Sequence, residues 1–203
     1  MLDFENKYYS KEINFICGCD EAGRGCLCGP VVAAAVVLPK NYSNPLINDS
    51  KQLTPKQREV LFLDIIKNAL SYGIGYIDSV TIDKINIYEA SRQAMIKAIN
   101  NLNYKYDLIL SDAMPINTLN KEVIPIIKGD AKCKCIAAAS IIAKVCRDHY
   151  MLAMALKYPQ YNLDKNKGYG TKTHLDALEK YGPIPKFHRF TYAPIKNRQL
   201  KLF

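Results

Sequence analysis

The sequence predicts an α/β protein whose functional groups lie at the ends of the strands of a central sheet. Apolar runs of strand length alternate with longer segments of helical periodicity. Acidic residues follow three of these apolar runs, at Asp20, Asp112 and Asp130. The length of 203 residues fits one domain, or one domain with a small appendage.

Each apolar run of strand length is expected to form one strand of the sheet. The expected strands are residues 13–20, 31–38, 72–77, 108–113 and 124–127. The run at residues 13–20 ends in Asp20, the run at residues 108–113 has Asp112 near its end, and the last run leads into Lys128-Gly129-Asp130. Acids at the ends of different strands could converge on one metal site.

Three helices are expected between and after these strands. The first is capped by Thr54, begins at Pro55 and is expected to bury Val60, Leu61, Leu63, Ile65, Ile66 and Leu70. The second covers residues 88–102, with Ala90, Ala94, Met95, Ala98 and Ile99 facing inward. The third is a long helix that opens with residues 136–145, where alanines allow close packing on the sheet.

The pair Asp20-Glu21 lies between two apolar runs, at residues 13–19 and 29–38. Burying two adjacent acids without a partner costs several kcal/mol per ion, so a cation is expected beside them. A divalent metal with oxygen ligands is the natural choice. A solvated surface pair is the alternative, but core strands on both sides argue against it. The Gly23-Arg24-Gly25 segment that follows lets a backbone approach a ligand closely, which suggests phosphate chemistry.

The composition favours a nucleic-acid partner inside the cell. The 28 basic and 19 acidic residues give a net charge of +9, which suits a polyanion. No apolar run reaches the roughly 18 residues of a membrane span, and the polar residues 1–14 do not resemble a signal peptide. Seven cysteines without a secretory signal indicate a reducing cytosol, so a cytoplasmic location is expected.

Six of the cysteines form three C-x-C pairs. The pairs are Cys17/Cys19, Cys26/Cys28 and Cys133/Cys135. Zinc sites usually space their cysteines by two to four residues, whereas C-x-C in a strand places both thiols on one face. The preferred interpretation is small buried apolar residues, and metal or redox use is the alternative.

The last quarter of the chain contains a basic, glycine-rich segment at residues 165–172, with Tyr169 at its centre. A tyrosine in a basic loop can stack on a sugar or a base. The alternative is a loop aromatic that packs on the body of the protein.

Over nearly its whole length, the chain resembles the ribonuclease HII family. The motifs that carry the resemblance are Asp20-Glu21-Ala22-Gly23-Arg24-Gly25, Asp49-Ser50-Lys51-Gln52-Leu53, Asp112-Ala113, Lys128-Gly129-Asp130-Ala131-Lys132, residues 136–145 with Arg147-Asp148, and residues 167–174. Each motif alone is modest, but their order and spacing together are highly specific.

The resemblance implies an RNase H-like fold: a central mixed five-stranded sheet flanked by helices, with a small C-terminal helical part. Residues 1–160 would form the catalytic core, and residues 161–203 a substrate-binding extension. The resemblance also implies that Asp20, Glu21, Asp112 and Asp130 are catalytic and hold Mg²⁺ or Mn²⁺, two ions during catalysis. Asp148 matches an acid near the site in some relatives and ranks behind these four.

The resemblance further implies a metal-dependent endoribonuclease that acts in DNA repair and replication. It would hydrolyse the RNA strand of RNA–DNA hybrids and nick DNA 5′ of embedded ribonucleotides, leaving 3′-hydroxyl and 5′-phosphate ends. Arg24 and the backbone of Gly23 and Gly25 would sense the ribose 2′-hydroxyl. Tyr169 would stack on the sugar beside the junction, and Lys51 and Lys172 are expected to contact phosphates.

The final five residues, Gln199-Leu200-Lys201-Leu202-Phe203, are similar to the short bacterial motif that docks replication proteins on the sliding clamp. A flexible peptide could place its apolar residues in a pocket on such a partner. The alternative is that these apolar residues fold back on the C-terminal helices. The protein itself is expected to be a monomer.

Two functions of other classes remain open at the level of sequence. A basic module that binds nucleic acid without cleaving it would not place four acids at strand ends, because they would repel the phosphates. A cysteine-ligated zinc protein would be recognised by tightly bound stoichiometric zinc.

Overall fold

A computed structural model describes residues 4–47, 53–117 and 120–199. A five-stranded sheet with the order β3-β2-β1-β4-β5 forms its centre. The strands are β1 (Ile16–Ala22), β2 (Val31–Val37), β3 (Ser71–Ile77), β4 (Leu108–Asp112) and β5 (Val123–Ile126). β2 is antiparallel to both of its neighbours, β1 and β3, whereas β4 runs parallel to β1 and β5 parallel to β4. The predicted mixed five-stranded sheet is therefore confirmed.

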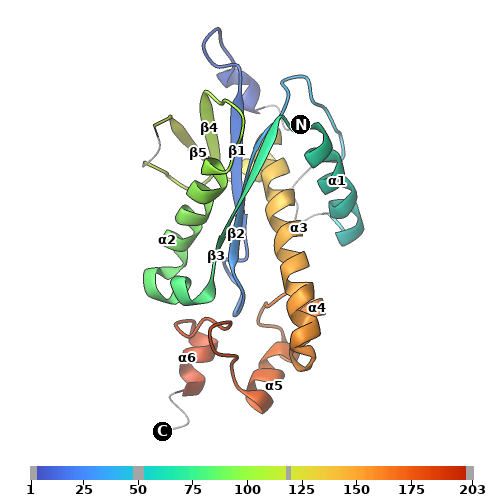
Figure 1. The fold of residues 1–203 in the computed structure, drawn as a ribbon, viewed down its shortest axis with the longest axis vertical. Coiled ribbons are helices and arrows are strands. Elements are labelled where there is room, and N and C mark those ends of the chain that lie inside the picture. The colour runs from blue at the N-terminus through green and yellow to red at the C-terminus, as the bar shows by residue number, and fades with distance from the viewer. Residues whose placement is uncertain (1–3, 48–52, 118–119, 200–203) are drawn as a thin grey trace.

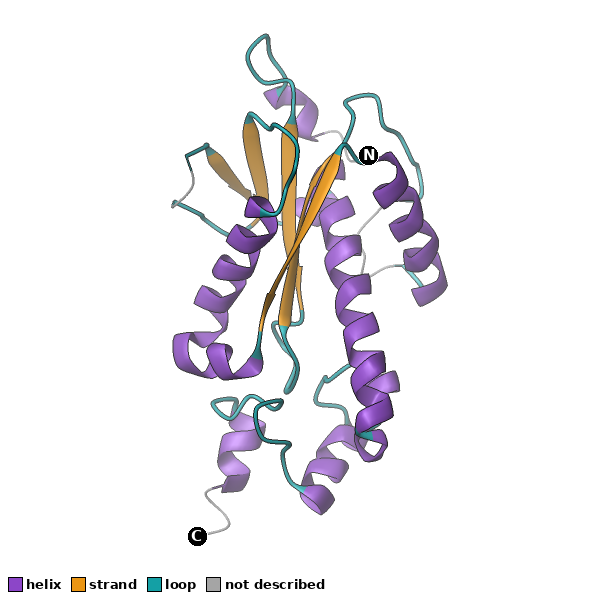
Figure 2. Cartoon of the chain, viewed as in Figure 1, coloured by secondary structure: helices purple, strands orange, loops and turns teal. Residues whose placement is uncertain are grey.

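Helices cover both faces of the sheet (Figures 1 and 2). The α-helices are α1 (Pro55–Asn68), α2 (Ser79–Asn100), α3 (Lys134–Lys157), α4 (Leu163–Asn166), α5 (Lys172–Tyr181) and α6 (Ala193–Gln199). The short 3₁₀ helices are η1 (Phe4–Tyr8), η2 (Gly129–Ala131) and η3 (Pro159–Tyr161). α2 packs on one face, and α1 and α3 pack on the other. The helices α4 to α6 lie beyond the end of the sheet at which β1 ends.

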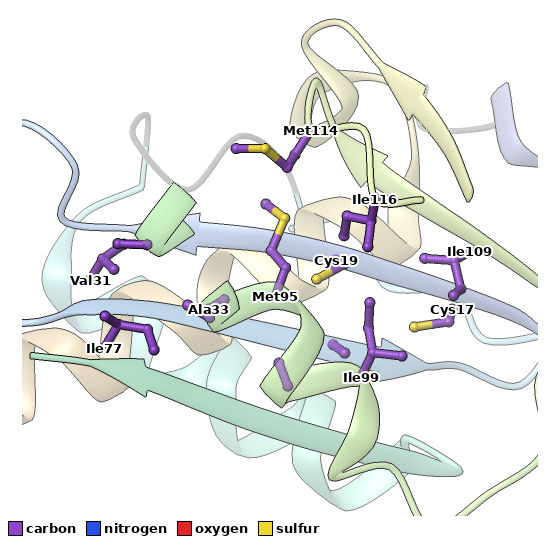
Figure 3. Packing of buried hydrophobic residues seen from close by; sticks show 14 of the residues in the cluster. Cys17, Cys19, Val31, Ala33, Ile77, Met95, Ile99, Ile109, Met114 and Ile116 are labelled. Atoms are coloured by element: carbon purple, nitrogen blue, oxygen red, sulfur yellow. The ribbon is translucent and has the colours of Figure 1, made fainter. Parts of the chain in front are cut away.

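The sheet packs closely on its helices because small residues line both faces. Cys17, Cys19 and Ala33 face Met95 of α2 in the core (Figure 3). On the opposite face, a Cβ atom added at Gly18 would lie 2.2 Å from the backbone carbon of Cys135, so α3 rests directly on β1. Six of the seven free cysteines are buried, which confirms the expectation of small buried residues.

Each edge strand of the sheet has a backbone position that cannot pair with a further strand. β5 has only four residues and contains Pro125, which has no N–H to donate to a further strand. On β3, the carbonyl of Ile74 accepts a hydrogen bond of 2.9 Å from the side chain of Asn101. Neither edge therefore presents a full ladder of free backbone groups.

The burial predicted for α1 is partly wrong. Leu61 and Ile65 are buried, but Val60 and Leu63 are 57% and 61% exposed. α1 contacts the rest of the protein along one narrow stripe, and residues one or two positions away from that stripe face solvent. Leu70 lies beyond the end of the helix.

The predicted start of the second helix is also wrong, because α2 begins at Ser79, capped by the side chain of Asp78. Asn86 interrupts α2 with a φ of 65° and a ψ of 166°. Its Oδ1 accepts hydrogen bonds from the amides of Tyr88 and Glu89, and so caps the second half of α2. The predicted element corresponds to that second half.

The C-terminal elements share a core with the loop that joins β1 to β2. Leu27 and Cys28 of this loop and Met151 of α3 pack with Leu163, Leu178 and Ile195. The predicted division of the chain at residue 160 stays a prediction. Within the described residues, no helix is both long enough and apolar enough to cross a membrane.

Candidate active site

Three aspartates converge at one end of the sheet. Asp20 is near the end of β1, Asp112 is the last residue of β4, and Asp130 lies in η2, which follows β5. Because β1, β4 and β5 are parallel, their carboxyl ends meet at the same edge. One carboxylate oxygen of each aspartate lies within 4.8 Å of the others. The carboxylates are therefore close enough together to hold a metal ion.

Backbone geometry and hydrogen bonds orient these carboxylates. Lys128 adopts a left-handed conformation, with a φ of 55°, and the chain turns there into η2. The amide of Gly129 donates a hydrogen bond of 2.8 Å to Oδ1 of Asp112. Asp20 accepts a hydrogen bond of 2.6 Å from the amide of Glu21 and another from the hydroxyl of Ser140. The acid pair lies inside β1, which extends to Ala22, two residues beyond the predicted end.

The electrostatics of the cluster favour a cation. Burial raises the pKa of Asp20 well above its usual value, and the charges of Glu21 and Asp112 raise it further. Burial also raises the pKa of Glu21, although Arg24 partly offsets this effect. Each raised pKa means that a negative charge here is unfavourable in the protein alone. A bound divalent cation would reverse that balance.

Glu21 lies beside the three aspartates and lines the same cavity as Asp20 and Asp112, but it is not one of the group whose oxygens lie within 4.8 Å of one another. Its Oε1 lies 3.2 Å from Nη1 of Arg24. Its Oε2 is buried and has no hydrogen-bond partner within the described ranges of the chain. A buried carboxylate oxygen that lacks a partner beside three converging aspartates fits a hard divalent cation, which prefers oxygen ligands.

A cavity of about 340 Å³ opens beside the carboxylates. Its lining residues are Asp20, Glu21, Ala22, Gly23, Arg24, Gly25, Asp112, Ser140, Lys144 and Tyr169. Tyr169 is 43% exposed, and its hydroxyl contacts the thiol of Cys26. The predicted ligands and the predicted substrate contacts Gly23, Arg24, Gly25 and Tyr169 are thus brought together.

Lys172, another predicted contact, does not line this cavity, because it is exposed at the first position of α5. Lys51 lies outside the described residues. Asp148 pairs with Lys144 at 2.7 Å and with Arg58 at 3.9 Å, and it is not one of the converging aspartates.

Ser140 and Lys144 are site residues that sequence reasoning missed. They lie four residues apart on α3, and Asp148 follows four residues later, so the three share one helical face. This spacing of polar residues within an otherwise apolar helix is the signal that could have found them. The ammonium of Lys144 also lies 5.8 Å from the centre of the Tyr169 ring.

A second cluster, Cys28, His174 and His188, is buried beneath the Tyr169 loop. The amide of Ile184 donates to Nδ1 of His188, so the proton of His188 is on Nε2. That Nε2 lies 3.1 Å from Nε2 of His174, whose Nδ1 donates to the carbonyl of Tyr169. A metal would have to displace the proton between the rings, so we assign this cluster as a hydrogen-bond chain.

The family of the chain follows from a comparison with family models. The model described as Ribonuclease HII matches residues 17–195, which span all four acids and Tyr169. The chain belongs to the ribonuclease HII family. It is therefore an endoribonuclease that degrades RNA in RNA–DNA hybrids.

Curated relatives agree with this membership over nearly the whole chain. A ribonuclease HII from Caldanaerobacter subterraneus subsp. tengcongensis is 54% identical over 193 residues, covering 95% of this chain and 80% of the relative. The Bacillus subtilis ribonuclease HII is 49% identical over 199 residues, covering 97% of this chain and 76% of the relative.

Solved structures share the fold. Ribonuclease H2 from Pyrococcus horikoshii OT3 superposes with a TM-score of 0.78 at 28% identity, covering 92% of this chain and 98% of that one. The ribonuclease HII of the Archaeoglobus fulgidus PCNA complex gives 0.73 at 26% identity, covering 88% and 95%. Bst-RNase HIII, solved with Mn²⁺, gives 0.70 at 15% identity, covering 94% and 71%, and supports the fold alone.

Proposed function

We propose that this endoribonuclease depends on divalent metal and nicks duplex DNA on the 5′ side of an embedded ribonucleotide, leaving 3′-hydroxyl and 5′-phosphate ends. The observation that carries the proposal is the convergence of Asp20, Asp112 and Asp130 beside a cavity that also contains Arg24 and Tyr169. Cleavage chemistry and sugar recognition would then take place in one site.

Asp20, Glu21, Asp112 and Asp130 are the proposed metal ligands, for Mg²⁺ or Mn²⁺. Two such ions, when bound, would supply an activated water and stabilisation of the leaving oxygen. The carboxylates would hold these ions next to the scissile phosphate, and the positive charge of the ions would offset the repulsion between carboxylates and phosphate. Ser140 and the amide of Gly129 fix the carboxylates of Asp20 and Asp112, respectively.

The loop at residues 23–25 and Tyr169 are the proposed readers of the ribonucleotide. The side chain of Arg24 is half-exposed, and its ion pair with Glu21 keeps it next to the proposed metal ligands. Gly23 and Gly25 leave backbone groups accessible to the 2′-hydroxyl, which separates RNA from DNA. The exposed part of the Tyr169 ring would stack on the adjacent sugar. Lys51 and Lys172 stay proposed phosphate contacts.

A cleavage assay tests this proposal directly. The substrate is a labelled DNA duplex with one ribonucleotide, incubated with Mg²⁺, with Mn²⁺ and with EDTA. A matched duplex without the ribonucleotide is the control. We expect one nick on the 5′ side of the ribonucleotide in the metal arms and none with EDTA. A duplex left intact in both metals would refute the proposal.

We also propose that the segment at residues 199–203 docks this enzyme on a sliding clamp during DNA repair and replication in the cytoplasm. The Archaeoglobus fulgidus ribonuclease HII was solved in complex with PCNA, which supports a protein partner. Apart from the backbone of Gln199, the segment lies outside the described residues. Titration of purified clamp with the full chain and with a chain ending at Arg198 tests the idea, and equal binding by both would end it.

A further inference from the structure

Two arginines, Arg147 on α3 and Arg189 in the segment before α6, are fully buried, with 0% exposure each. No carboxylate pairs with either of them among the residues that the structure describes. A buried guanidinium without an acid needs other acceptors for its five N–H donors. Both side chains find these acceptors in backbone carbonyls, and most of the carbonyls belong to one loop.

That loop runs from Gly23 to Pro30 and contains the proposed 2′-hydroxyl reader, Arg24. Arg189 donates from Nη1 to the carbonyl of Arg24 at 2.8 Å, and from Nε and Nη2 to the carbonyl of Gly29 at 3.1 and 2.9 Å. The hydroxyl of Tyr192 donates to the same Arg24 carbonyl at 2.7 Å and accepts from Arg189 at 3.0 Å. The backbone of Arg24 is thus held from the C-terminal part of the chain.

Arg147 holds the same loop from α3. It donates to the carbonyls of Pro30 at 3.0 Å and Cys28 at 3.1 Å, and to the carbonyl of Lys167 at 2.9 Å. Lys167 precedes Tyr169 by two residues, so one guanidinium joins the two loops of the proposed reader. Arg147 also lies against Gly23, where an added Cβ would come within 2.0 Å of its Nε.

The segment that carries Arg189 is itself fixed to the sheet side of the molecule. Asp83 of α2 accepts hydrogen bonds from the amides of Phe190 and Thr191, at 2.7 and 3.0 Å. The amide of Arg189 also donates to the carbonyl of Leu27. Arg189 is therefore anchored on both sides and has little freedom to follow the loop if the loop moves.

We propose that Arg189 is a positioning residue that fixes the backbone of Arg24, with Arg147 as its counterpart on the other side of the loop. Ribonucleotide recognition then depends on two buried cations that never touch the substrate. This inference rests on the proposed role of Arg24 as reader of the 2′-hydroxyl. It predicts that the effects of Arg189 and Arg24 substitutions are not independent.

The test is a double-mutant cycle on kcat/KM for the duplex with one ribonucleotide. Arg189→Lys keeps the charge but cannot span two carbonyls in a fork. We expect it to lower kcat/KM about ten-fold in the wild-type background and less than about three-fold in the Arg24→Ala background. Arg92→Lys is the matched control, because Arg92 pairs with Glu89 on α2, away from the loop, and it should leave both backgrounds unchanged.

Equal losses in the two backgrounds, or no loss in either, would overturn the inference. If Arg189→Lys does not fold, Tyr192→Phe replaces it, because this change deletes one of the two hydrogen bonds to the Arg24 carbonyl and leaves the ring in place. It should lower kcat/KM about three-fold in the wild type and not in Arg24→Ala; any other pattern overturns the inference. A wild-type enzyme that does not nick at all would refute the proposed function itself, which is a separate result.

Discussion

Two buried polar clusters flank the loop at residues 23–30, and they differ in what completes them. In the first, Asp20, Asp112 and Asp130 bring like charges together, and an oxygen of Glu21 next to them lacks a protein partner within the described chain. In the second, which comprises His174 and His188 together with the buried Arg147 and Arg189, the ring protons and N–H groups of both guanidiniums reach acceptors within the protein.

The difference teaches where a ligand is to be sought. The carboxylate cluster is electrostatically unfavourable until a cation joins it. The histidine and arginine cluster is satisfied in the protein alone, so a ligand would have to break bonds that already exist. The first cluster is therefore expected to control activity, and the second to control stability and the position of the loop.

The largest expected effect is the loss of cleavage in Asp112→Asn. The variant should cleave a single-ribonucleotide duplex at least about a thousand-fold more slowly, because several kcal/mol of transition-state charge stabilisation are lost. Its melting temperature in EDTA should equal or exceed that of the wild type, since one of several like charges is gone. The exposed Asp176→Asn is the matched control and should retain full activity. A lower melting temperature in EDTA would show that Asp112 is mainly structural.

Metal binding should change stability only through the first cluster. Mg²⁺ at a hundred times its dissociation constant is expected to stabilise the wild-type fold by about 2.7 kcal/mol. Differential scanning fluorimetry with and without Mg²⁺ measures this as a rise in melting temperature. In Asp112→Asn the rise should shrink strongly, and EDTA should reverse it in the wild type. A full rise in the variant would place the metal elsewhere.

The second cluster should respond to acid. Burial and the neighbouring His174 lower the pKa of His188 from 6.5 to about 3, and burial lowers the pKa of His174 as well. Below about pH 6.5 the unfolded chain takes up protons that the folded chain refuses, so stability is complete above this pH and falls as the pH drops towards 3. Tyr161 packs against both rings, and the thiol of Cys28 lies beside them.

The variant His188→Phe sharpens this point. It leaves the Ile184 amide and Nε2 of His174 without partners, and should lower the free energy of unfolding by about 1–3 kcal/mol at pH 7.5. Between pH 6.5 and 4 it should lose less stability than the wild type, as measured by urea denaturation. His149→Phe, at an exposed histidine, is the control. If the free energy of unfolding fell in parallel with pH in the wild type and the variant, the assignment of this cluster as a hydrogen-bond chain would be wrong.

The smallest expected effect is at Tyr169, where the two clusters meet. Tyr169→Ala should lower kcat/KM at a single ribonucleotide about ten-fold, as expected from a lost stacking contact of roughly 1–3 kcal/mol. Tyr169→Phe keeps the ring, loses only the hydroxyl next to Cys26, and should stay within about two-fold of the wild type. Equal losses in the two variants would assign the role to the hydroxyl instead of the ring.

Sequence reasoning succeeded where local pattern and tertiary position agree. The apolar runs that became β1 and β4 point their acids to one edge, so Asp20 and Asp112 could be foreseen as neighbours. It missed the first half of α2, because Asn86 joins that half to the predicted segment through a backbone conformation that local propensity does not reveal. The exposure of Val60 and Leu63 depends on the width of the α1 surface that contacts α3. The periodicity of the sequence alone does not determine that width.

The buried arginines and histidines could not be predicted for another reason. Arg189 bonds to the carbonyl of Arg24 and Arg147 to that of Cys28, more than a hundred positions away along the chain. Backbone carbonyls occur at every residue, so no side-chain motif reveals which of them an arginine will reach. Ser140 and Lys144 were within reach of sequence reasoning, because their spacing marks one face of α3.

The incomplete backbone ladders at the two sheet edges affect how the protein behaves at high concentration. Pro125 on β5 and the Asn101–Ile74 contact on β3 deny an incoming strand part of its ladder. Growth of the sheet from one molecule into the next is therefore disfavoured at both edges, and the net charge of +9 adds mutual repulsion. We expect the enzyme to stay dispersed when crowded on a polyanionic chromosome, with its partners recruited through loops and helices.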